Sequence, residues 1–340
     1  MIPFSKPSIR RAEMNAVLSC MVSDSLEHGN EARELVSLAS AAMGRSGGLA
    51  VREYQRAIDL AFGALNLQPG SVVGMTALIP QAYRRVALLR GLKPVLIDVD
   101  PDTALLTPER VAEQHAATPL DALAVRHVFG QRQPLDGFAG LGIPVIEDAG
   151  EAVGAEPEDG GRAEFTVVSL EPDKVITAGG GTLVLAGGRS QHRGLRKNAE
   201  HLADEQLLPD MNASLGLTQL RKLSELLGRR HEIREYYIRA LHTHRTLPYP
   251  GPGLAVAYTL PVVLDTDMRS VVEYARKHGV STRTAFSDTA VALEDGEQPA
   301  AEGSVKAARG LLLRCVLFPI YPTLTNAQIQ QIGKVLATVP

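Results

Sequence analysis

The sequence has few aromatic residues: its 340 residues include 7 Phe, 8 Tyr and no Trp. A binding site that depends on ring stacking therefore has few side chains to draw on. Cysteine is scarcer still, since Cys20 and Cys315 are the only two. Two cysteines exclude a disulfide framework and a cysteine-rich zinc site, and we expect both to be reduced thiols in the core.

An excess of positive charge is also missing. The 35 Lys and Arg are balanced by 38 Asp and Glu, and the net charge of −3 gives no electrostatic basis for binding nucleic acid or an anionic membrane. The chain has no apolar run long enough to span a membrane, and its start, MIPFSKPSIRRAEMNAV, lacks the apolar segment of a signal peptide. We therefore expect a cytoplasmic protein whose partner is a small molecule, without a metal.

Short apolar runs alternate with helical patterns between residues 48 and 186. Near-continuous apolar strands separated by helices are typical of a parallel sheet covered on both faces. The pattern predicts an α/β fold with a seven-stranded, mainly parallel sheet and a ligand site beyond the carboxyl ends of its strands. The predicted strands are Gly48–Val51, Ser71–Met75, Pro94–Val99, Ala122–His127, Pro144–Ile146, Thr166–Leu170 and Thr182–Leu185, and the early helices are Gln55–Leu67 and Gln81–Arg90.

The pattern changes after Gly188. Leucines recur along Ser214–Leu241 at helical spacing, which predicts one long amphipathic helix, with room for a kink. The PYPGPG stretch at 248–253 indicates a linker. We therefore predict a large domain over 1–244 and a small C-terminal α+β domain over 245–340. Its predicted elements are strands Val256–Leu264 and Val280–Phe286 and helices Met268–His278, Ser304–Cys315 and Asn326–Val339, with an exposed acidic loop over Asp288–Gly303.

Two residues at neighbouring strand ends suggest a chemistry. Asp148 ends one apolar strand, Lys174 follows another, and the glycines 179–181 come directly after. A lysine amine forms a Schiff base with pyridoxal phosphate (PLP), and a carboxylate keeps the ring nitrogen protonated. Spacing alone leaves ordinary alternatives open: a solvated surface lysine, an aspartate that caps a turn, and glycines that make a tight turn.

Several segments, in the right order, resemble the DegT/StrS-type nucleotide-sugar aminotransferases, which are fold-type-I PLP enzymes. These segments cover nearly the whole chain: IPFSKPSI (2–9), KPVLIDVDPDT (93–103), HVFGQ (127–131), IPVIEDAGEAVGA (143–155), Ser169–Lys174, NASLGLTQLRKL (212–223), HGVSTR (278–283) and LFPIYPTLT (317–325). The resemblance implies a fold-type-I PLP-transferase-like large domain and a homodimer with active sites at the interface. The substrates would be a keto-sugar nucleotide and an amino donor such as glutamate.

The resemblance also assigns roles to single residues. Lys174 matches the Schiff-base lysine, and Asp148 matches the partner of the pyridinium nitrogen. Ser169 matches the serine that contacts the cofactor phosphate. His127 and Gly130 match a segment beside the cofactor, and Glu151, at the usual position of Gln, is a further candidate cofactor contact. Arg283 matches a small-domain arginine that can face the site, although a surface role fits it as well.

The cofactor grip departs from the family pattern. Arg52, Glu53, Tyr54 and Gln55 replace the usual Ser-Gly-Thr at the start of the helix that holds the phosphate. Tyr54 obstructs the close approach that glycine allows, and Glu53 adds a negative charge that costs roughly 3 kcal/mol per charge pair at ~5 Å. Arg52 or Arg56 can offset that charge by a bidentate phosphate contact, or both can be solvated, and Gln55 is a further candidate contact.

Other positions have changed as well. Pro80 stands where an aromatic ring is expected against the cofactor, and Tyr83 follows on the covering helix. The segment that reaches a neighbouring subunit's phosphate is shortened to HLADEQLLPDMNA (201–213). Three hypotheses follow: a PLP-dependent aminotransferase, a catalytically inactive paralogue that serves as a binding or regulatory subunit, and a different PLP reaction. In an inactive paralogue, Asp148 and Lys174 would form a relic ion pair.

Overall fold

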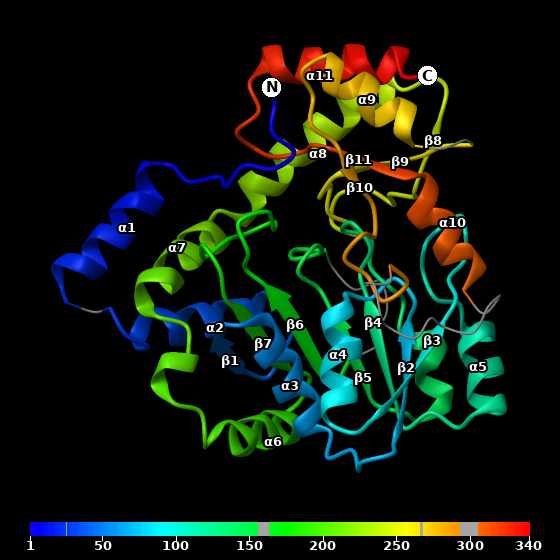
Figure 1. The fold of residues 1–340 in the computed structure, drawn as a ribbon. Helices are drawn as coiled ribbons and strands as arrows, with labels where there is room; N and C mark the ends of the chain where they lie inside the picture. The colour runs from blue at the N-terminus through cyan, green and yellow to red at the C-terminus, as the bar shows by residue number, and fades with distance from the viewer. Residues whose placement is uncertain (25, 156–162, 266–267, 293–304) are drawn as a thin grey trace.

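A computed structural model of the chain describes residues 1–24, 26–155, 163–265, 268–292 and 305–340. Within these ranges no helix is long and apolar enough to cross a membrane. The predicted acidic loop over Asp288–Gly303 lies mostly outside the described residues. Figure 1 shows two layers of strands, a large one below and a small one above, with helices around both.

A seven-stranded sheet forms the large layer, with the order β1-β7-β6-β5-β4-β2-β3. Only β7 runs against its neighbours, so the other six strands end at the same edge, which confirms the predicted mainly parallel sheet. The strands are β1 (Gly48–Val51), β2 (Val72–Thr76), β3 (Lys93–Ile97), β4 (Ala122–Arg126), β5 (Val145–Asp148), β6 (Phe165–Ser169) and β7 (Thr182–Ala186).

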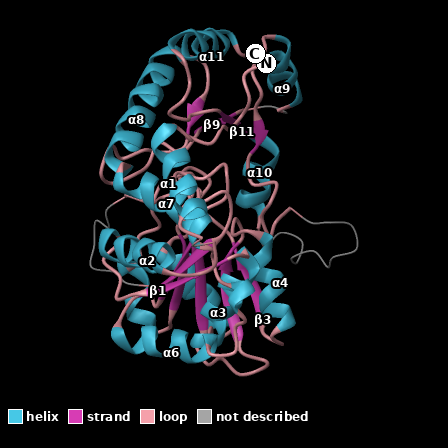
Figure 2. Ribbon diagram, turned by 90° about the vertical axis from the view of Figure 1, so that its left-hand side faces the viewer, coloured by secondary structure: helices cyan, strands magenta, loops and turns pink. Residues whose placement is uncertain are grey.

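Helices cover both faces of this sheet because its strands are apolar on both sides. One face packs on α3 (Tyr54–Ala64), α4 (Gln81–Leu89) and α6 (Arg189–Ala199) through a core that includes Ile58, Val86 and Leu195. The other face packs on α2 (Asn30–Ala42), α5 (Pro108–Ala117) and α7 (Asp210–Arg221). Figure 2 shows α2 and α4 on opposite sides of the strands. Short 3₁₀ turns, η1 (Asp136–Leu141) and η2 (Asp204–Gln206), complete this part.

The helix predicted over Ser214–Leu241 is two helices. Lys222 leaves the helical region of backbone space, with φ −108° and ψ 17°, and separates α7 from α8 (Leu223–Ala240). The first of the two lies against α1 (Arg11–Val22) and α2, whereas α8 leads up to the small layer. Because of the break, α7 packs in the core of the large layer and α8 packs against the small layer.

A four-stranded antiparallel sheet with the order β10-β11-β9-β8 forms the small layer. Its strands are β8 (Arg245–Thr246), β9 (Leu260–Val263), β10 (Arg283–Thr284) and β11 (Cys315–Phe318), and its helices are α9 (Arg269–Lys277), α10 (Lys306–Arg314) and α11 (Asn326–Thr338). Ile2 pairs with Val280, so the N-terminal arm also joins this layer. The domain boundary at 244/245 stays a prediction.

Candidate active site

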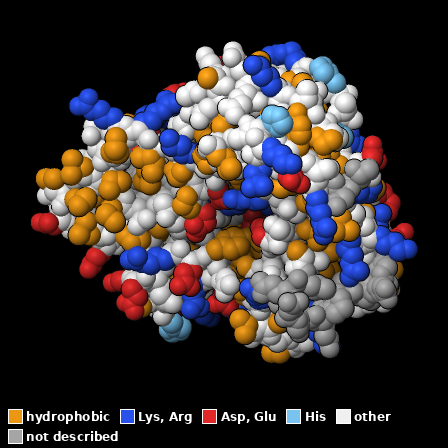
Figure 3. All heavy atoms as spheres, turned by 45° about the horizontal axis from the view of Figure 1, so that its top comes forward, with side chains coloured by type: hydrophobic (Ala, Val, Ile, Leu, Met, Phe, Trp, Pro, Cys, Tyr) orange, Lys and Arg blue, Asp and Glu red, His pale blue; other side chains and the backbone are white. Residues whose placement is uncertain are grey.

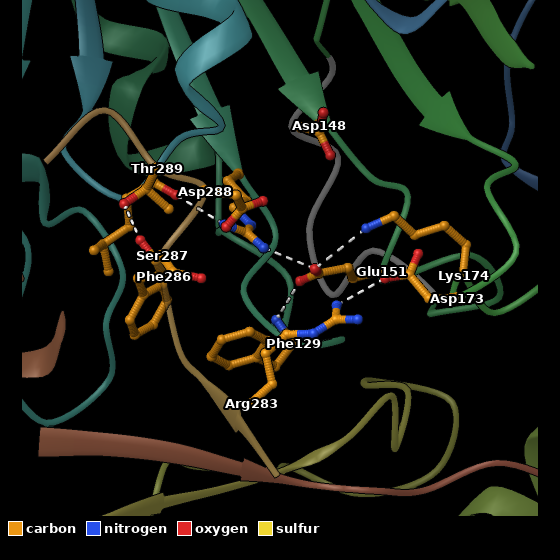
Figure 4. A network of polar contacts seen from close by, with 12 residues as sticks. Phe129, Asp148, Glu151, Asp173, Lys174, Arg283, Phe286, Ser287, Asp288 and Thr289 are labelled. Atoms are coloured by element: carbon orange, nitrogen blue, oxygen red, sulfur yellow. Dashed lines mark hydrogen bonds and ion pairs between the residues drawn. The ribbon is translucent and has the colours of Figure 1, made fainter. Parts of the chain in front are cut away.

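A cavity of about 380 Å³ lies above the carboxyl ends of β4, β5 and β6, where a parallel sheet places its ligands. Lys174 and Glu151 line it from the large sheet, and Arg283 and Leu317 line it from β10 and β11. Figure 4 shows Lys174, Glu151 and Arg283 around one space. This cavity lies beyond the strand ends, where the sequence predicts a ligand site, and ligand binding there stays a prediction.

Asp148 ends β5 as predicted, but its carboxylate already has two partners. The hydroxyls of Tyr54 and Tyr83 both donate to Asp148 Oδ2, the second at 3.1 Å. Tyr54 is the first residue of α3 and Tyr83 lies on α4, and both helices cover the same face of the sheet. The two rings meet edge to face, with their centroids 6.2 Å apart.

Burial raises the pKa of all three groups, Asp148, Tyr54 and Tyr83, because it disfavours their charged forms. Burial raises the pKa of Asp148, although the hydrogen bond from Tyr54 and the charge of Arg126 oppose that rise. Burial, with the nearby Asp148 carboxylate, also raises the pKa of Tyr54 and of Tyr83 well above the usual range. Both phenols therefore remain hydrogen-bond donors at neutral pH.

Lys174 is held by an anion rather than left as a free amine. Its Nζ lies 3.6 Å from Glu151 Oε1 and 5.6 Å from the centre of the Tyr258 ring. Glu151 also accepts hydrogen bonds from Arg126 at 2.7 Å and from the backbone N–H of Phe129 at 3.0 Å. Glu151 thus bridges two cations, as Figure 4 shows.

The pKa of Lys174 is raised as a result. Burial alone would lower the pKa of this amine, but Tyr258, Glu151 and Asp173 outweigh it. Burial in turn raises the pKa of Tyr258 to about 12. The raised pKa favours the ammonium form of Lys174, which is a hydrogen-bond donor.

Ser169 ends β6 and the glycines 179–181 follow Lys174, while a contact of Ser169 with a cofactor phosphate stays a prediction. Ser169 is buried at the end of β6, with the backbone of Gly150 packed against it. The three glycines have positive φ, and Asn212 of α7 donates to the carbonyl of Ala178 at 2.7 Å. This loop therefore fixes the backbone that follows Lys174.

His127 lies away from the cavity. Arg126 of β4 is paired with Asp148 of β5, so the two share the face under α3 and α4, and His127 and Glu147 turn to the opposite face. His127 Nε2 lies 3.0 Å from Glu147, which also pairs with Arg45 and accepts from Thr166. A role for His127 beside a cofactor stays a prediction.

The predicted phosphate contacts are not gathered at the site either. Arg52 and Gln55 are exposed at the start of α3, and the backbone N–H of Arg52 donates to Gln206. Arg56 pairs with Asp59 at 3.0 Å, one turn along the same helix. A role for Arg52 or Gln55 in phosphate binding stays a prediction.

Some residues at the site were not foreseen from the sequence. Arg126, Phe129, Phe286 and Asp288 line the cavity, and Arg283 donates to Asp173 at 2.8 Å. Arg126 could have been found from the sequence, because it is a charged residue in the apolar strand Ala122–Arg126. A charge buried in a strand requires a partner, which marks the residue as part of a polar site. Within the described ranges, no group of His, Cys, Asp or Glu side chains is arranged to hold a metal ion.

Comparison with known proteins identifies the family. The model of the DegT/DnrJ/EryC1/StrS aminotransferase family matches residues 7–337. The chain belongs to this family. Aminotransferases of the family depend on PLP, and the fold relatives include PLP- and PMP-form structures.

Solved structures share the fold over nearly the whole chain. The aminotransferase TlmJ from Streptoalloteichus hindustanus is 25% identical, with a TM-score of 0.87 and 99% and 98% of the two chains covered. A putative sugar aminotransferase, Spr1654 from Streptococcus pneumoniae, in its PLP form, is 18% identical, with a TM-score of 0.88 and the same coverage. A GDP-4-keto-6-deoxymannose-3-dehydratase (ColD) mutant with bound GDP-perosamine is 16% identical, with a TM-score of 0.86 and 99% and 100% covered.

The Tyr54 side chain bears on how the family cofactor would fit beside Asp148. The resemblance implies that the cofactor ring meets the Asp148 carboxylate and that its phosphate meets the start of the helix that begins at Tyr54; both stay predictions. The Tyr54 side chain runs from that helix start to Asp148. It therefore lies along the path between the two points at which the cofactor would be held.

Proposed function

We propose that this family member binds a sugar nucleotide in the cavity beside Lys174. The observation that carries the proposal is the lining of that cavity, which mixes the donors Arg126, Lys174 and Arg283 with the acceptors Glu151 and Asp173. Sugar hydroxyls both donate and accept hydrogen bonds, so they need such a mixture. The ColD relative, whose structure holds GDP-perosamine, supports the same ligand class.

Aromatic side chains complete the lining. The Phe129 and Phe286 rings pack against each other, tilted by 36° with their centres 4.9 Å apart, and Phe4 lies under the Arg283 guanidinium at 4.4 Å. Aromatic faces pack well against the apolar C–H face of a sugar ring, while a few polar groups fix its orientation. A sugar therefore fits this surface better than a purely apolar ligand does.

We favour binding without aminotransfer, as in an inactive paralogue that serves as a binding or regulatory subunit. Asp148 accepts from two phenols of the chain itself, and Lys174 Nζ lies 3.6 Å from the Glu151 carboxylate. The second candidate is a PLP-dependent aminotransferase with the cofactor on Lys174 and glutamate as amino donor. The retention of Lys174 and Asp148 at neighbouring strand ends favours it.

Calorimetric titration tests the binding proposal. Purified protein is titrated with dTDP-glucose, UDP-N-acetylglucosamine and GDP-mannose, and we expect at least one to bind. Because a hydrogen bond to a charged group contributes about 1.5–3 kcal/mol, Arg283→Gln should weaken that affinity by about tenfold or more. Arg276→Gln changes an exposed arginine of α9 that does not line the cavity, and this matched control should leave the affinity unchanged. Absence of binding for all three, or equal affinity of both variants, would contradict sugar-nucleotide binding.

We further propose that two copies associate through α1. Its outward side and the adjoining residues expose large apolar side chains, which Figure 3 shows gathered over this helix: Ile9, Met14, Leu18, Met21, Val22 and Leu26. Exposed apolar patches of this kind mark contact surfaces between proteins. The family resemblance, which implies a homodimer, supports a second copy as the partner.

A further inference from the structure

We infer that Tyr54 occupies the position of the cofactor ring and keeps PLP off Lys174. This inference stands apart from sugar-nucleotide binding, since it concerns a different ligand and a different residue. It predicts that a single substitution makes room for PLP in a chain that otherwise excludes it.

The first argument is the path of the Tyr54 side chain. Tyr54 begins α3 directly after β1, and its hydroxyl reaches the carboxylate at the end of β5. A small residue at this helix start would leave the helix N–H groups and Asp148 facing a shared space. Tyrosine fills that space with a ring whose hydroxyl uses the carboxylate as its acceptor.

The second argument is that Tyr54 is held in this position. Its ring packs edge to face on Tyr83, which packs in turn on Phe62 at 6.3 Å. Tyr83 and Phe62 are fully buried, and Tyr83 donates to the same carboxylate oxygen. Moving Tyr54 aside would break one hydrogen bond of a buried carboxylate and one ring contact at once.

The third argument concerns charge. Arg126 shares the sheet face of Asp148 and its charge opposes the raised pKa of that carboxyl group. A protonated ring nitrogen would place a further cation next to the Arg126 guanidinium, which is itself buried. Arg126 and Tyr54 therefore already stabilise the Asp148 carboxylate, which is what a protonated ring nitrogen would otherwise do.

Borohydride trapping tests the inference. Wild-type protein, Tyr54→Ala and Tyr54→Phe are incubated with PLP and reduced, and the phosphopyridoxyl group is located by mass spectrometry. We expect no adduct on Lys174 in the wild type and an adduct in Tyr54→Ala, with PLP affinity about tenfold or more higher by absorption titration. Tyr54→Phe keeps the ring and should stay unlabelled. Adducts on exposed Lys93 report non-specific labelling in every sample.

A second tyrosine controls for the loss of a ring as such. Tyr236→Ala, on α8 away from the cavity, should behave as the wild type. Tyr54→Ser replaces Tyr54→Ala if circular dichroism shows that the alanine variant is unfolded. Labelling of Lys174 in the wild type would overturn the inference. So would its absence from the folded Tyr54→Ala or Tyr54→Ser protein, or equal labelling of Tyr54→Phe and Tyr54→Ala. None of these outcomes bears on the calorimetric test of sugar-nucleotide binding.

Discussion

At the scale of single residues, the state of Lys174 separates the two candidate functions. An amine that attacks a carbonyl must lose its proton, and the neighbours of Lys174 hold that proton in place. Glu151 is the nearest of them, and it is also the partner of Arg126 and of the Phe129 backbone. Replacing the usual Gln by Glu at this position therefore changes the charge of the lysine's closest neighbour.

Lys174 should react slowly with acetic anhydride at pH 8. Because its pKa is raised, less free amine is present than in a lysine with the ordinary pKa, and each unit of pKa changes that fraction about tenfold. Glu151→Gln removes a charge that raises the pKa and should make Lys174 react faster. Competitive labelling read by mass spectrometry measures both rates. Glu171→Gln, exposed in the same loop, is the control, and an equal effect of both variants would contradict the assignment.

At the scale of elements, the loop after β4 joins the large sheet to the chain segment before β9. Gly130 has φ +94° and its carbonyl accepts from the Val256 N–H at 2.9 Å, so the two segments touch along their backbones. Phe129, one residue earlier, also has positive φ and donates its N–H to Glu151. This loop therefore sets both the backbone contact with Val256 and one hydrogen bond of Glu151.

Gly130→Ala should destabilise the protein more than Gly70→Ala does. Both positions have positive φ, which costs alanine about 1–2 kcal/mol. At Gly130 a Cβ would also collide with the Val256 carbonyl, whereas at Gly70 it would meet open space. Urea unfolding measures the free energy of unfolding of both variants, and the difference between their losses gives the cost of the collision with Val256. Equal losses of stability would show that the segments can move apart freely.

At the scale of the whole molecule, α1 presents an apolar surface with no cover among the described residues. Its inner side packs on α7 through Cys20 and its neighbours, while Leu18 is 56% exposed and Val22 is 78% exposed. A helix with apolar residues on both sides is typical of one that is buried from both sides. The second side is what we assign to the partner copy.

Leu18→Glu should convert the proposed dimer to a monomer, because a charge would be buried in the apolar contact. Sedimentation velocity of wild type and variant gives the two masses directly. Leu89→Glu changes an equally apolar residue, 84% exposed on α4, and should leave the mass unchanged. A monomeric wild type would contradict the proposal. A mass change caused by Leu89→Glu and not by Leu18→Glu would place the interface elsewhere.

The sequence by itself determined the seven strands of the large sheet and two of the helices that cover it, α3 and α4. Apolar periodicity is a local property, and all seven strands were found to within a few residues, although the break at Lys222 was not located. It also placed Asp148 and Lys174 at strand ends. The alternation of side chains along β4 would in addition have separated Arg126 from His127.

Only the tertiary structure decided which side chains meet. Tyr54 and Asp148 are 94 positions apart, and no local pattern joins a helix start to a distant strand end. The scarcity of aromatic residues did not show whether a binding site would contain them. The fold gathers four of them around one cavity: Phe4, Phe129, Tyr258 and Phe286. Contacts between distant residues follow from how layers pack, and packing is a property of the whole chain.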